Sequence, residues 1–437
     1  MERYPSYKPT GVKWLGEIPS HWEMLALKHI LKLKKDIVGR RSSQYDLLSL
    51  TLKGVVKRDM ENPEGKFPAS FDTYQAVEPN DFIFCNFDNE ETPRAVGLSL
   101  YKGMITGAYD VLSRKNPKLT DGFLIYYFLY IDDAKRFKPL YKGLRKTVPF
   151  DSFMSYKIPV PSLKEQAAIV SYLDTATAKI DAAIAQQQKM IDLLNERKQI
   201  IINRAVTKGL NPNAKMKDSG VEWIGDVPEG WEINKFKNLY KTRTGITFTK
   251  AQLVEFGEPV ISYGQIHSKD NWCASVNPDL IRHIPTMLTE GNQGALAEKG
   301  DFLFADTSED FEGCGNNVYI DTDKPIYAGY HTILAKCNNN QCGAYLAYLF
   351  ASTKWRGQIR SMVNGVKVYS VTQSIIKNAN VILPPFDEQK AIADHIKERV
   401  IVIDKAIKGA NHQISLLQER KQIIINEVVT GKVKVTN

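Results

Sequence analysis

The sequence predicts an α+β protein in which two mixed α/β globular domains are separated by two long helices, and the helices pair as an antiparallel intramolecular coiled coil. A pseudo-twofold internal repeat is the first reason: GVKWLGEIPSHWE at 11–23 returns as GVEWIGDVPEGWE at 220–232, with seven of thirteen positions identical. A second echo aligns 165–206 with 388–429 without a gap, with twenty of 42 positions identical. The spacings are 209 and 223 residues, so a solenoid of modules of about 20–50 residues is excluded.

These repeats divide the chain into four segments. We expect a globular domain at 1–160, a long helix at 161–210, a second globular domain at 211–385 and a second long helix at 386–437. The globular parts contain short β-type runs such as DFIFCNF and HTILAK, and each has one aromatic-rich helical patch, FLIYYFLY or AYLAYLF. Between the two repeated segments the halves of the sequence resemble each other only weakly. We therefore expect the repeated segments to form a shared architecture and the segments between them to form different binding surfaces.

The first long helix is predicted to begin just after Pro161. Ser162 stands three residues before Glu165, which is the spacing of a capping box. Neither Gly nor Pro follows until Gly209, so the pattern predicts a helix of about 44 residues and about 65 Å.

Both long segments carry an apolar seam that repeats every 3.5 residues, as a coiled coil requires. Each seam needs a partner, because a stripe of Ile and Leu would otherwise face water, and the obvious partner is the other copy. Polar side chains interrupt the seam at Thr177, Gln187, Lys198 and Lys421, and such residues fix the register. A bundle helix that faces a loose surface at these points is the alternative. The predicted seam residues are Leu173, Ile180, Ile184, Ile191, Leu194, Lys198, Ile201, Ile396, Ile403, Ile407, Ile414, Leu417, Lys421 and Ile424.

Composition narrows the class of protein. The 437 residues include 43% hydrophobic residues, which excludes wholesale disorder. The 58 basic and 49 acidic residues leave a net charge of +9, which permits a nucleic-acid partner. The five cysteines form no CxxC pair, and neither a signal peptide nor an apolar run of membrane-spanning length is present. We therefore expect a cytoplasmic protein without a membrane partner.

No catalytic motif was found in the sequence. It has no phosphate-binding GxxxxGK[ST] loop, no HExxH and no GxSxG turn. The string LPPF at 383–386 resembles the NPPY-type motif of amino-methyltransferases but lacks its polar first residue, and a proline stop before the second helix is the preferred interpretation. Asp306, Glu309 and Asp310 form an acidic cluster that we interpret as a solvated loop rather than a metal site. We expect no catalytic, cofactor-binding or metal-binding residue in this chain.

Basic residues cluster in both globular parts, as binding to phosphates and reading of base edges would require. In both, a glycine turn followed by cations stands close before the last strand, and glycine lets a backbone approach a phosphate. An ordinary solvated cation remains the alternative for each single residue. The DNA-binding candidates are Arg40, Arg41, Lys57, Arg58, Arg94, Lys142, Gly143, Arg145 and Lys146 in the first domain, and Lys250, Lys269, Arg282, Arg356, Arg360, Gly365 and Lys367 in the second.

The repeated frame resembles the specificity (S) subunit of type I restriction-modification systems. The resemblance rests on the paired GVxWxGxxPxxWE boxes, on the proline followed by EQ that enters each long helix, and on the LL..ERKQIII strings near the helix ends. It covers essentially the whole chain. It implies two target recognition domains that each read one half of a bipartite DNA site, with the helices setting the gap between the halves.

The same resemblance implies a non-catalytic subunit that binds double-stranded DNA. Two methyltransferase (M) subunits are expected to dock on the helical regions, and restriction/translocase (R) subunits to join them. The assembled complex would be a DNA adenine methyltransferase and ATP-dependent endonuclease, with S-adenosylmethionine, ATP and Mg²⁺ bound by the partners and no cofactor bound by this chain. Two alternatives stay open: a coiled-coil interaction scaffold without DNA sequence recognition, and a self-sufficient methyltransferase or nuclease.

Overall fold

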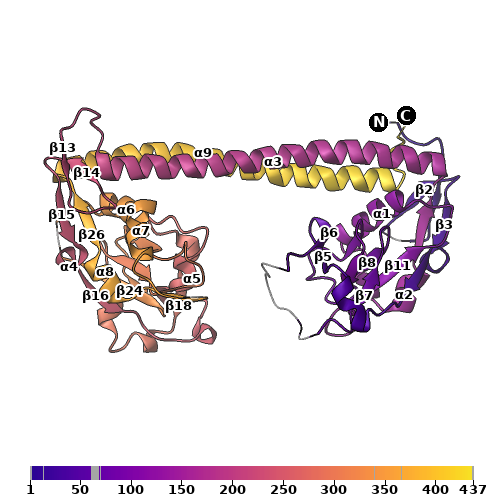
Figure 1. The fold of residues 1–437 in the computed structure, drawn as a ribbon, viewed down its shortest axis with the longest axis horizontal. Coiled ribbons are helices and arrows are strands. Elements are labelled where there is room, and N and C mark those ends of the chain that lie inside the picture. The colour runs from indigo at the N-terminus through magenta and orange to yellow at the C-terminus, as the bar shows by residue number, and fades with distance from the viewer. Residues whose placement is uncertain are drawn as a thin grey trace. The chain divides into compact units, whose positions relative to one another are not determined.

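The chain folds into two compact units that share two long helices. The computed structural model describes residues 2–12, 14–60, 68, 70–338, 340–365 and 367–435. Unit 1 comprises 1–188 and 411–437, and unit 2 comprises 189–410. Each unit contains one globular part and a portion of both α3 (Leu163–Lys208) and α9 (Phe386–Val429) (Figure 1).

Unit 1 is built around a four-stranded antiparallel sheet in the order β4-β11-β8-β9. Its strands are β1 (Tyr7–Pro9), β2 (Glu17–Pro19), β3 (Glu23–Ala26), β4 (Leu31–Lys34), β5 (Leu48–Thr51), β6 (Gly54–Lys57), β7 (Gln75–Val77), β8 (Phe82–Phe84), β9 (Val96–Leu98), β10 (Gly103–Ile105), β11 (Asp110–Arg114) and β12 (Lys157–Val160). Its short helices are η1 (Leu27–His29), η2 (Gly39–Gln44), α1 (Asp121–Asp133), η3 (Lys138–Leu140) and α2 (Phe150–Ser155).

Unit 2 has a four-stranded antiparallel sheet of its own in the order β16-β24-β20-β22. Its strands are β13 (Met216–Asp218), β14 (Asp226–Pro228), β15 (Glu232–Lys235), β16 (Tyr240–Thr244), β17 (Glu258–Ile261), β18 (Arg282–Ile284), β19 (Leu296–Ala297), β20 (Phe302–Ala305), β21 (Thr307–Ser308), β22 (Asn317–Tyr319), β23 (Ile326–Ala328), β24 (Thr332–Cys337), β25 (Tyr369–Ser370) and β26 (Asn380–Leu383). Its short helices are α4 (Phe236–Leu239), η4 (Lys250–Gln252), α5 (Tyr263–Ile266), η5 (Pro278–Leu280), η6 (Thr286–Leu288), η7 (Gln293–Ala295), α6 (Gly343–Ala351), α7 (Thr353–Arg360) and α8 (Gln373–Asn378).

The internal repeat extends through both globular parts. The sheet order β4-β11-β8-β9 of unit 1 corresponds strand for strand to β16-β24-β20-β22 of unit 2. The pair β3:β12 corresponds to β15:β26, and the hairpin β1:β2 corresponds to β13:β14. The additions differ, because unit 1 has the pairs β5:β6 and β7:β10 where unit 2 has the sheet β18-β17-β23-β19. A common frame therefore carries two different sets of loops and strands.

The strand and helix types predicted for the globular parts are confirmed. DFIFCNF contains β8 and HTILAK covers all of β24 except its last residue, while FLIYYFLY lies in α1 and AYLAYLF in α6. The capping box at the start of α3 is also confirmed, since the Glu165 amide donates to Ser162 Oγ at 3.3 Å and the Ser162 amide donates to the Glu165 carboxylate at 3.1 Å. The prolines of LPPF separate β26 from α9, which begins at Phe386.

The two repeated motifs meet in each unit. The Trp22 indole donates to the Glu165 carboxylate at 3.1 Å, and the equivalent Trp231 indole donates to the Glu388 carboxylate at 2.9 Å. Both tryptophans are completely buried. The tryptophan near the end of each GVxWxGxxPxxWE box thus contacts the glutamate of the EQ motif. This contact holds the start of each long helix against the box of the same repeat. We call this contact the Trp–Glu lock.

The glutamine of each EQ motif fixes the same helix start from the other side. Gln166 is buried, its side chain donates to the Pro161 carbonyl at 2.9 Å, and it accepts from the Thr120 amide. Gln389 does the same with the Pro384 carbonyl at 2.8 Å and with the Cys342 amide. Thr120 and Cys342 precede α1 and α6, so each glutamine joins the long helix to the aromatic helix of its globular part.

The two long helices lie antiparallel in both units. In unit 1, Lys421 of α9 forms an ion pair with Asp181 of α3 at 2.7 Å, and in unit 2 Lys198 of α3 forms one with Asp404 of α9 at 2.8 Å. These contacts follow a single antiparallel register. The apolar core of unit 1 accordingly contains Leu173 beside the end of α9, and that of unit 2 contains Ile396 beside the end of α3. The predicted antiparallel pairing of the helices is confirmed.

No helix in the described part of the chain is both long enough and apolar enough to cross a membrane.

Candidate nucleic-acid interface

The first glycine turn predicted to contact DNA, and the segment that leads from the second into β25, lie at equivalent places of the repeated sheet. In unit 1 the turn at 142–147 lies beside the loop at 86–94, which follows β8. In unit 2 the segment at 367–371 lies beside the loop at 306–316, which follows β20. We call these the first and the second loop pair.

Equivalent backbone hydrogen bonds hold both loop pairs. The Val148 amide donates to the Asn86 carbonyl, and the Val371 amide donates to the Asp306 carbonyl, each at 2.8 Å. Both bonds come just before a short helix, α2 or α8, that leads into the last strand. Equivalent strand ends, those of β8 and β20, therefore support the turn at 142–147 and the segment at 367–371.

The turn of the first loop pair is tightly closed. The amide and carbonyl of Lys142 exchange hydrogen bonds with those of Thr147, at 2.9 and 3.0 Å. Gly143 has a φ of +69°, a left-handed conformation that side chains disfavour. The Arg145 carbonyl accepts a hydrogen bond from the Asp88 amide at 2.7 Å. This geometry leaves the Leu144 side chain at the tip fully exposed.

Carboxylates of the 86–94 loop already neutralise two cations of this turn. Arg145 pairs with Asp88 at 2.6 Å and lies over the Phe87 ring at 4.9 Å. Lys146 pairs with Glu90, and hydrogen bonds from Lys138 and Lys146 lower the pKa of Glu90 to about 2. These pairs hold the turn in place. Lys142 has no side-chain partner among the residues that the structure describes.

The other cations predicted in the first domain lie outside the turn. Arg94 is drawn inward by Asp133 at 3.2 Å, with its side chain only 19% exposed. Arg41 pairs with Asp36 and Lys57 with Asp46, at 2.8 and 2.6 Å.

Arg40 and Arg58 complete the predicted set of the first domain. Arg40 is exposed on η2. Arg58 is half-buried, and its amide donates to the Leu47 carbonyl. Within the described ranges, no hydrogen bond or ion pair joins Arg40, Arg41 or Lys57 to the first loop pair.

Two predicted cations of the second domain are engaged by the 306–316 loop. Arg356 donates to the Glu312 carbonyl, and Arg360 donates to the same carbonyl at 2.6 Å and pairs with the Glu312 carboxylate at 2.8 Å. Burial, followed by the charge of Arg360, lowers the pKa of the Arg356 guanidinium. These arginines therefore shape the loop, and their guanidinium groups point into the protein rather than standing free for a phosphate.

The remaining predicted residues of the second domain lie at the surface. Lys250 begins η4, Lys269 follows α5, and Lys367 lies next to β25; all three are exposed. Arg282 donates to the carbonyls of two neighbouring residues. Gly365 is exposed, while residue 366, which follows it, lies outside the described residues.

All fourteen predicted seam positions are buried or half-buried in the helix pair. Neighbours such as Asp192 and Lys405 are exposed, whereas Ile202 and Ile425, next to Ile201 and Ile424 near the helix ends, are buried more deeply than these two predicted seam residues. The two seam lysines, Lys198 and Lys421, each reach an aspartate of the opposite helix.

The acidic cluster of the second domain has structural partners. Asp306 accepts from the Thr307 hydroxyl and pairs with His331, and Asp310 accepts from the Gly313 amide. Among the described residues, no group of three or more His, Cys, Asp or Glu side chains is arranged to hold a metal ion.

The carboxylates that pair with the seam lysines and with the arginines of the loop pairs were not identified from the sequence. Asp181 and Asp404 occupy identical places in the two repeats, as do Lys198 and Lys421, so the doubled sequence contained the signal for both ion pairs. No comparable signal marks Asp88 or Glu312, because their partners are brought close only by the fold.

Comparison with known proteins identifies relatives over the whole chain. A family described as "Type I restriction modification DNA specificity domain" matches residues 106–191 and 228–414, more than half of the sequence. The putative type I restriction enzyme MjaX specificity subunit of Methanocaldococcus jannaschii is 25% identical over 96% of this chain and 96% of its own. The type I restriction enzyme EcoKI specificity subunit of Escherichia coli is 22% identical over 95% of this chain and 90% of its own.

A solved structure shares the fold. It comes from work on the complex assembly and conformational transition of the type I R-M system, and its TM-score against this chain is 0.64. The likeness spans 95% of this chain and 99% of the solved chain at 13% sequence identity.

Proposed function

Because the chain belongs to the type I restriction modification DNA specificity domain family, we propose that it is the sequence-specificity subunit of a type I restriction-modification complex. In this role each globular part reads one half of a bipartite site on double-stranded DNA. The helix pair sets the distance between the two halves. The cytoplasmic location expected from the sequence is part of this proposal.

The observation that carries the proposal is the duplicated sheet with unlike loops. The order β4-β11-β8-β9 recurs as β16-β24-β20-β22, and equivalent amides, those of Val148 and Val371, hold equivalent loops. The contacts of those loops differ, since Asp88 of the first loop pairs with Arg145 of its own turn, whereas Glu312 of the second loop pairs with Arg360 of α7. One frame with two different recognition surfaces is what a protein needs to read two different half-sites.

The chemistry is assigned to partner subunits. Specificity subunits are non-catalytic, and DNA adenine methylation and ATP-dependent cleavage would come from the methyltransferase and restriction subunits. S-adenosylmethionine, ATP and Mg²⁺ would bind to those partners rather than to this chain.

A duplicated exposed surface supports docking of two methyltransferase subunits. In unit 2, Leu193 and Ile200 of α3 are 55% and 58% exposed, and in unit 1 the equivalent Leu416 and Ile423 of α9 are 43% and 47% exposed. The two members of each pair are seven residues apart, so they lie on the same face of their helix, away from the seam. A solvated helix gains nothing from exposing such pairs, whereas two copies of one partner would cover them equally.

The proposal is tested by sequencing methylated bases in cells that express this chain with its methyltransferase subunit. A methylated motif in two parts with an unread gap between them is expected. A continuous methylated motif, or none, contradicts the proposal. If no methylated motif is found, the assembled complex should next be tested for DNA binding. Phosphate contacts make affinity fall with salt, so the absence of salt-dependent DNA binding would favour the interaction scaffold.

A further inference from the structure

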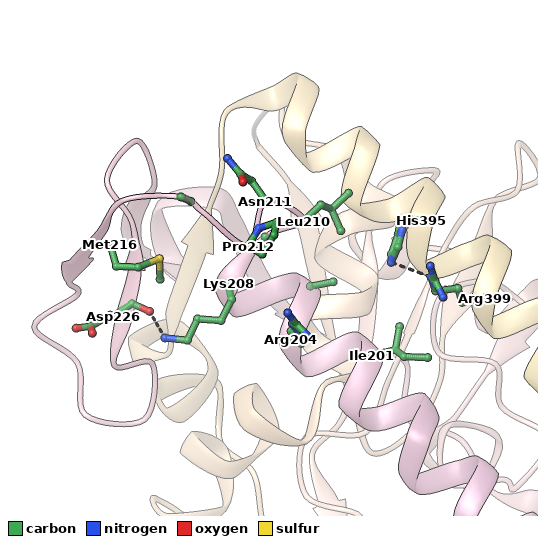
Figure 2. A pocket seen from close by; sticks show the side chains of 13 residues that line it. Ile201, Arg204, Lys208, Leu210, Asn211, Pro212, Met216, Asp226, His395 and Arg399 are labelled. Atoms are coloured by element: carbon green, nitrogen blue, oxygen red, sulfur yellow. Dashed lines mark hydrogen bonds between the residues drawn. The ribbon is translucent and has the colours of Figure 1, made fainter.

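A basic cavity lies where α3 ends, beside α9, in unit 2. Its volume is about 620 Å³, within the usual range of ligand sites, and four basic side chains line it: Arg204, Lys208, His395 and Arg399 (Figure 2). The one carboxylic acid residue in the lining is Asp226, whose backbone carbonyl accepts from Lys208. We call this space the basic cavity.

The terminal guanidinium nitrogens of both arginines in the basic cavity have no acceptor among the residues that the structure describes. Arg204 is exposed and makes no hydrogen bond or ion pair with any residue that the structure describes. Arg399 donates only through Nε, to His395 Nε2 at 3.0 Å, so its terminal nitrogens have no acceptor in the described part of the chain. The negative end of the α3 dipole accounts for a cation at Lys208, but it does not account for Arg399 on the other helix.

The internal repeat shows that this charge is peculiar to unit 2. At the equivalent positions of unit 1, His395 and Arg399 correspond to Tyr172 and Ala176, while Arg204 and Lys208 correspond to Glu427 and Gly431. The two chain ends occupy that region of unit 1.

Two contacts fix the chain ends there. The Tyr7 hydroxyl donates to the Gly431 carbonyl at 3.1 Å, and the Lys434 amide donates to the Glu2 carbonyl at 2.8 Å. At this place unit 1 joins the segments at 2–7 and 431–434, whereas unit 2 has a cavity lined by four basic side chains.

Apolar residues also line the basic cavity: Ile201, Ala205, Leu210, Pro212 and Met216. A DNA backbone would satisfy the arginines but would leave these residues without apolar contact. A peptide segment with an acidic residue next to an apolar one matches both features, because guanidinium groups bind carboxylates in a planar, bidentate manner.

We propose that the basic cavity binds an acidic segment of a protein partner, once per chain. The inference rests on the proposed function, in that the partner is the methyltransferase subunit. Its consequence is that two copies of that subunit, docked on the equivalent exposed pairs, are held unequally, and the copy on unit 2 has an additional anchor that the other copy lacks.

The experiment combines the purified chain with its methyltransferase subunit, and counts bound copies by native mass spectrometry. The variant Arg204→Gln/Arg399→Gln removes both free cations, and Lys397→Gln/Lys408→Gln removes the same charge from exposed α9 positions outside the cavity. We expect the cavity variant to lose affinity for one copy by about a hundredfold and to keep the other, because each charge-assisted contact is worth about tenfold. The control should bind both copies as the native chain does.

A photo-crosslinking amino acid at Asn211, which also lines the basic cavity, identifies the occupant. We expect a crosslink to a single acidic methyltransferase segment. Unchanged binding of both copies by the cavity variant, equal weakening of both, or a crosslink to DNA would each overturn the inference. If the native chain bound no methyltransferase subunit at all, the proposed function itself would fail.

Discussion

The indole of Trp231 donates a hydrogen bond to the Glu388 carboxylate at 2.9 Å, although the two residues are 157 positions apart in the chain. Gly209, just after α3, packs against the same pair, since a Cβ there would lie 3.0 Å from the Glu388 carboxylate and 3.1 Å from the Trp231 ring. This contact therefore adds to the apolar packing that joins the end of one long helix to the start of the other in unit 2.

Removing the Glu388 carboxylate is expected to destabilise unit 2. Glu388→Ala leaves the buried indole N–H without an acceptor, which costs about 1–3 kcal/mol, whereas Glu388→Gln retains an acceptor and costs less. Urea unfolding measures the difference. Glu398→Ala, at an exposed position of the same helix, is the control and should stay within about 0.5 kcal/mol of the native chain. Equal effects of all three substitutions would mean that the Trp–Glu lock contributes nothing.

The equivalent carboxylate of unit 1 predicts a dependence of stability on pH. Burial alone would raise the pKa of Glu165, but hydrogen bonds from Ser162, His21 and Trp22 outweigh it and lower the pKa to about 2 from an ordinary value of 4.5. A group with a lowered folded-state pKa stabilises the fold above its unfolded pKa, and this contribution is lost as the pH falls through the folded value.

The unfolding free energy should therefore decrease between about pH 4.5 and 2 more steeply in the native chain than in Glu165→Gln. Chemical unfolding at a series of pH values measures both slopes, and their difference removes the contribution of other carboxylates such as Glu90. Parallel curves would show that Glu165 is not held in its charged form by these contacts.

The ion pair between Lys198 and Asp404 is expected to contribute modestly and to help define the register. Its side chains are 28% and 50% exposed, so a coupling energy of about 0.2–1 kcal/mol is expected. A double-mutant cycle with Lys198→Ala and Asp404→Ala measures it, and the exchange Lys198→Asp/Asp404→Lys should recover part of the loss. A coupling that does not weaken in high salt would contradict an electrostatic origin.

Local patterns in the sequence were sufficient for some of the strands, for the two aromatic-rich helices and for the helix pair. The 3.5-residue period identified Leu173 and Ile396 as seam residues, and both are fully buried. The matching sheet orders in the two units were not predictable, because strand pairing depends on contacts between distant segments, and the strands β4 and β16 have little sequence in common.

The candidate interface was predictable in outline only. The turn at Gly143 followed from glycine and its neighbours. That Arg145 pairs with Asp88, 57 residues away, did not, because charge in a sequence does not indicate which partner will neutralise it. The sequence therefore located the turn but overestimated how many of its cations are free.

Lengthening the helix pair is expected to change the spacing of the recognised half-sites. Four residues inserted at Gln186 of α3, with four before Ile414 of α9 so that both helices lengthen together, add about 6 Å of helix, close to two base pairs of DNA. The methylated motif should keep both halves and gain one or two base pairs in its gap. The single insertion at Gln186 breaks the register and should shift the preferred spacer or abolish recognition. Binding of the original site with unchanged affinity would refute the role of the helices as a spacer.

The tip of the first loop pair is expected to influence one half-site only. Leu144 is completely exposed on a turn that is closed by its own hydrogen bonds, so Leu144→Ala should leave the unfolding midpoint unchanged. If the tip enters a groove, loss of its apolar contact should relax one half of the methylated motif by about tenfold, at a cost of about 1–3 kcal/mol per base pair, while the other half stays the same. Leu100→Ala, 71% exposed elsewhere in the same domain, is the control. Relaxation of both halves, or of neither, would show that the turn does not read sequence.

The Lys142→Ala variant removes a cation of the same turn. It should weaken binding to all DNA sequences, and the slope of log affinity against log salt concentration should fall by about one.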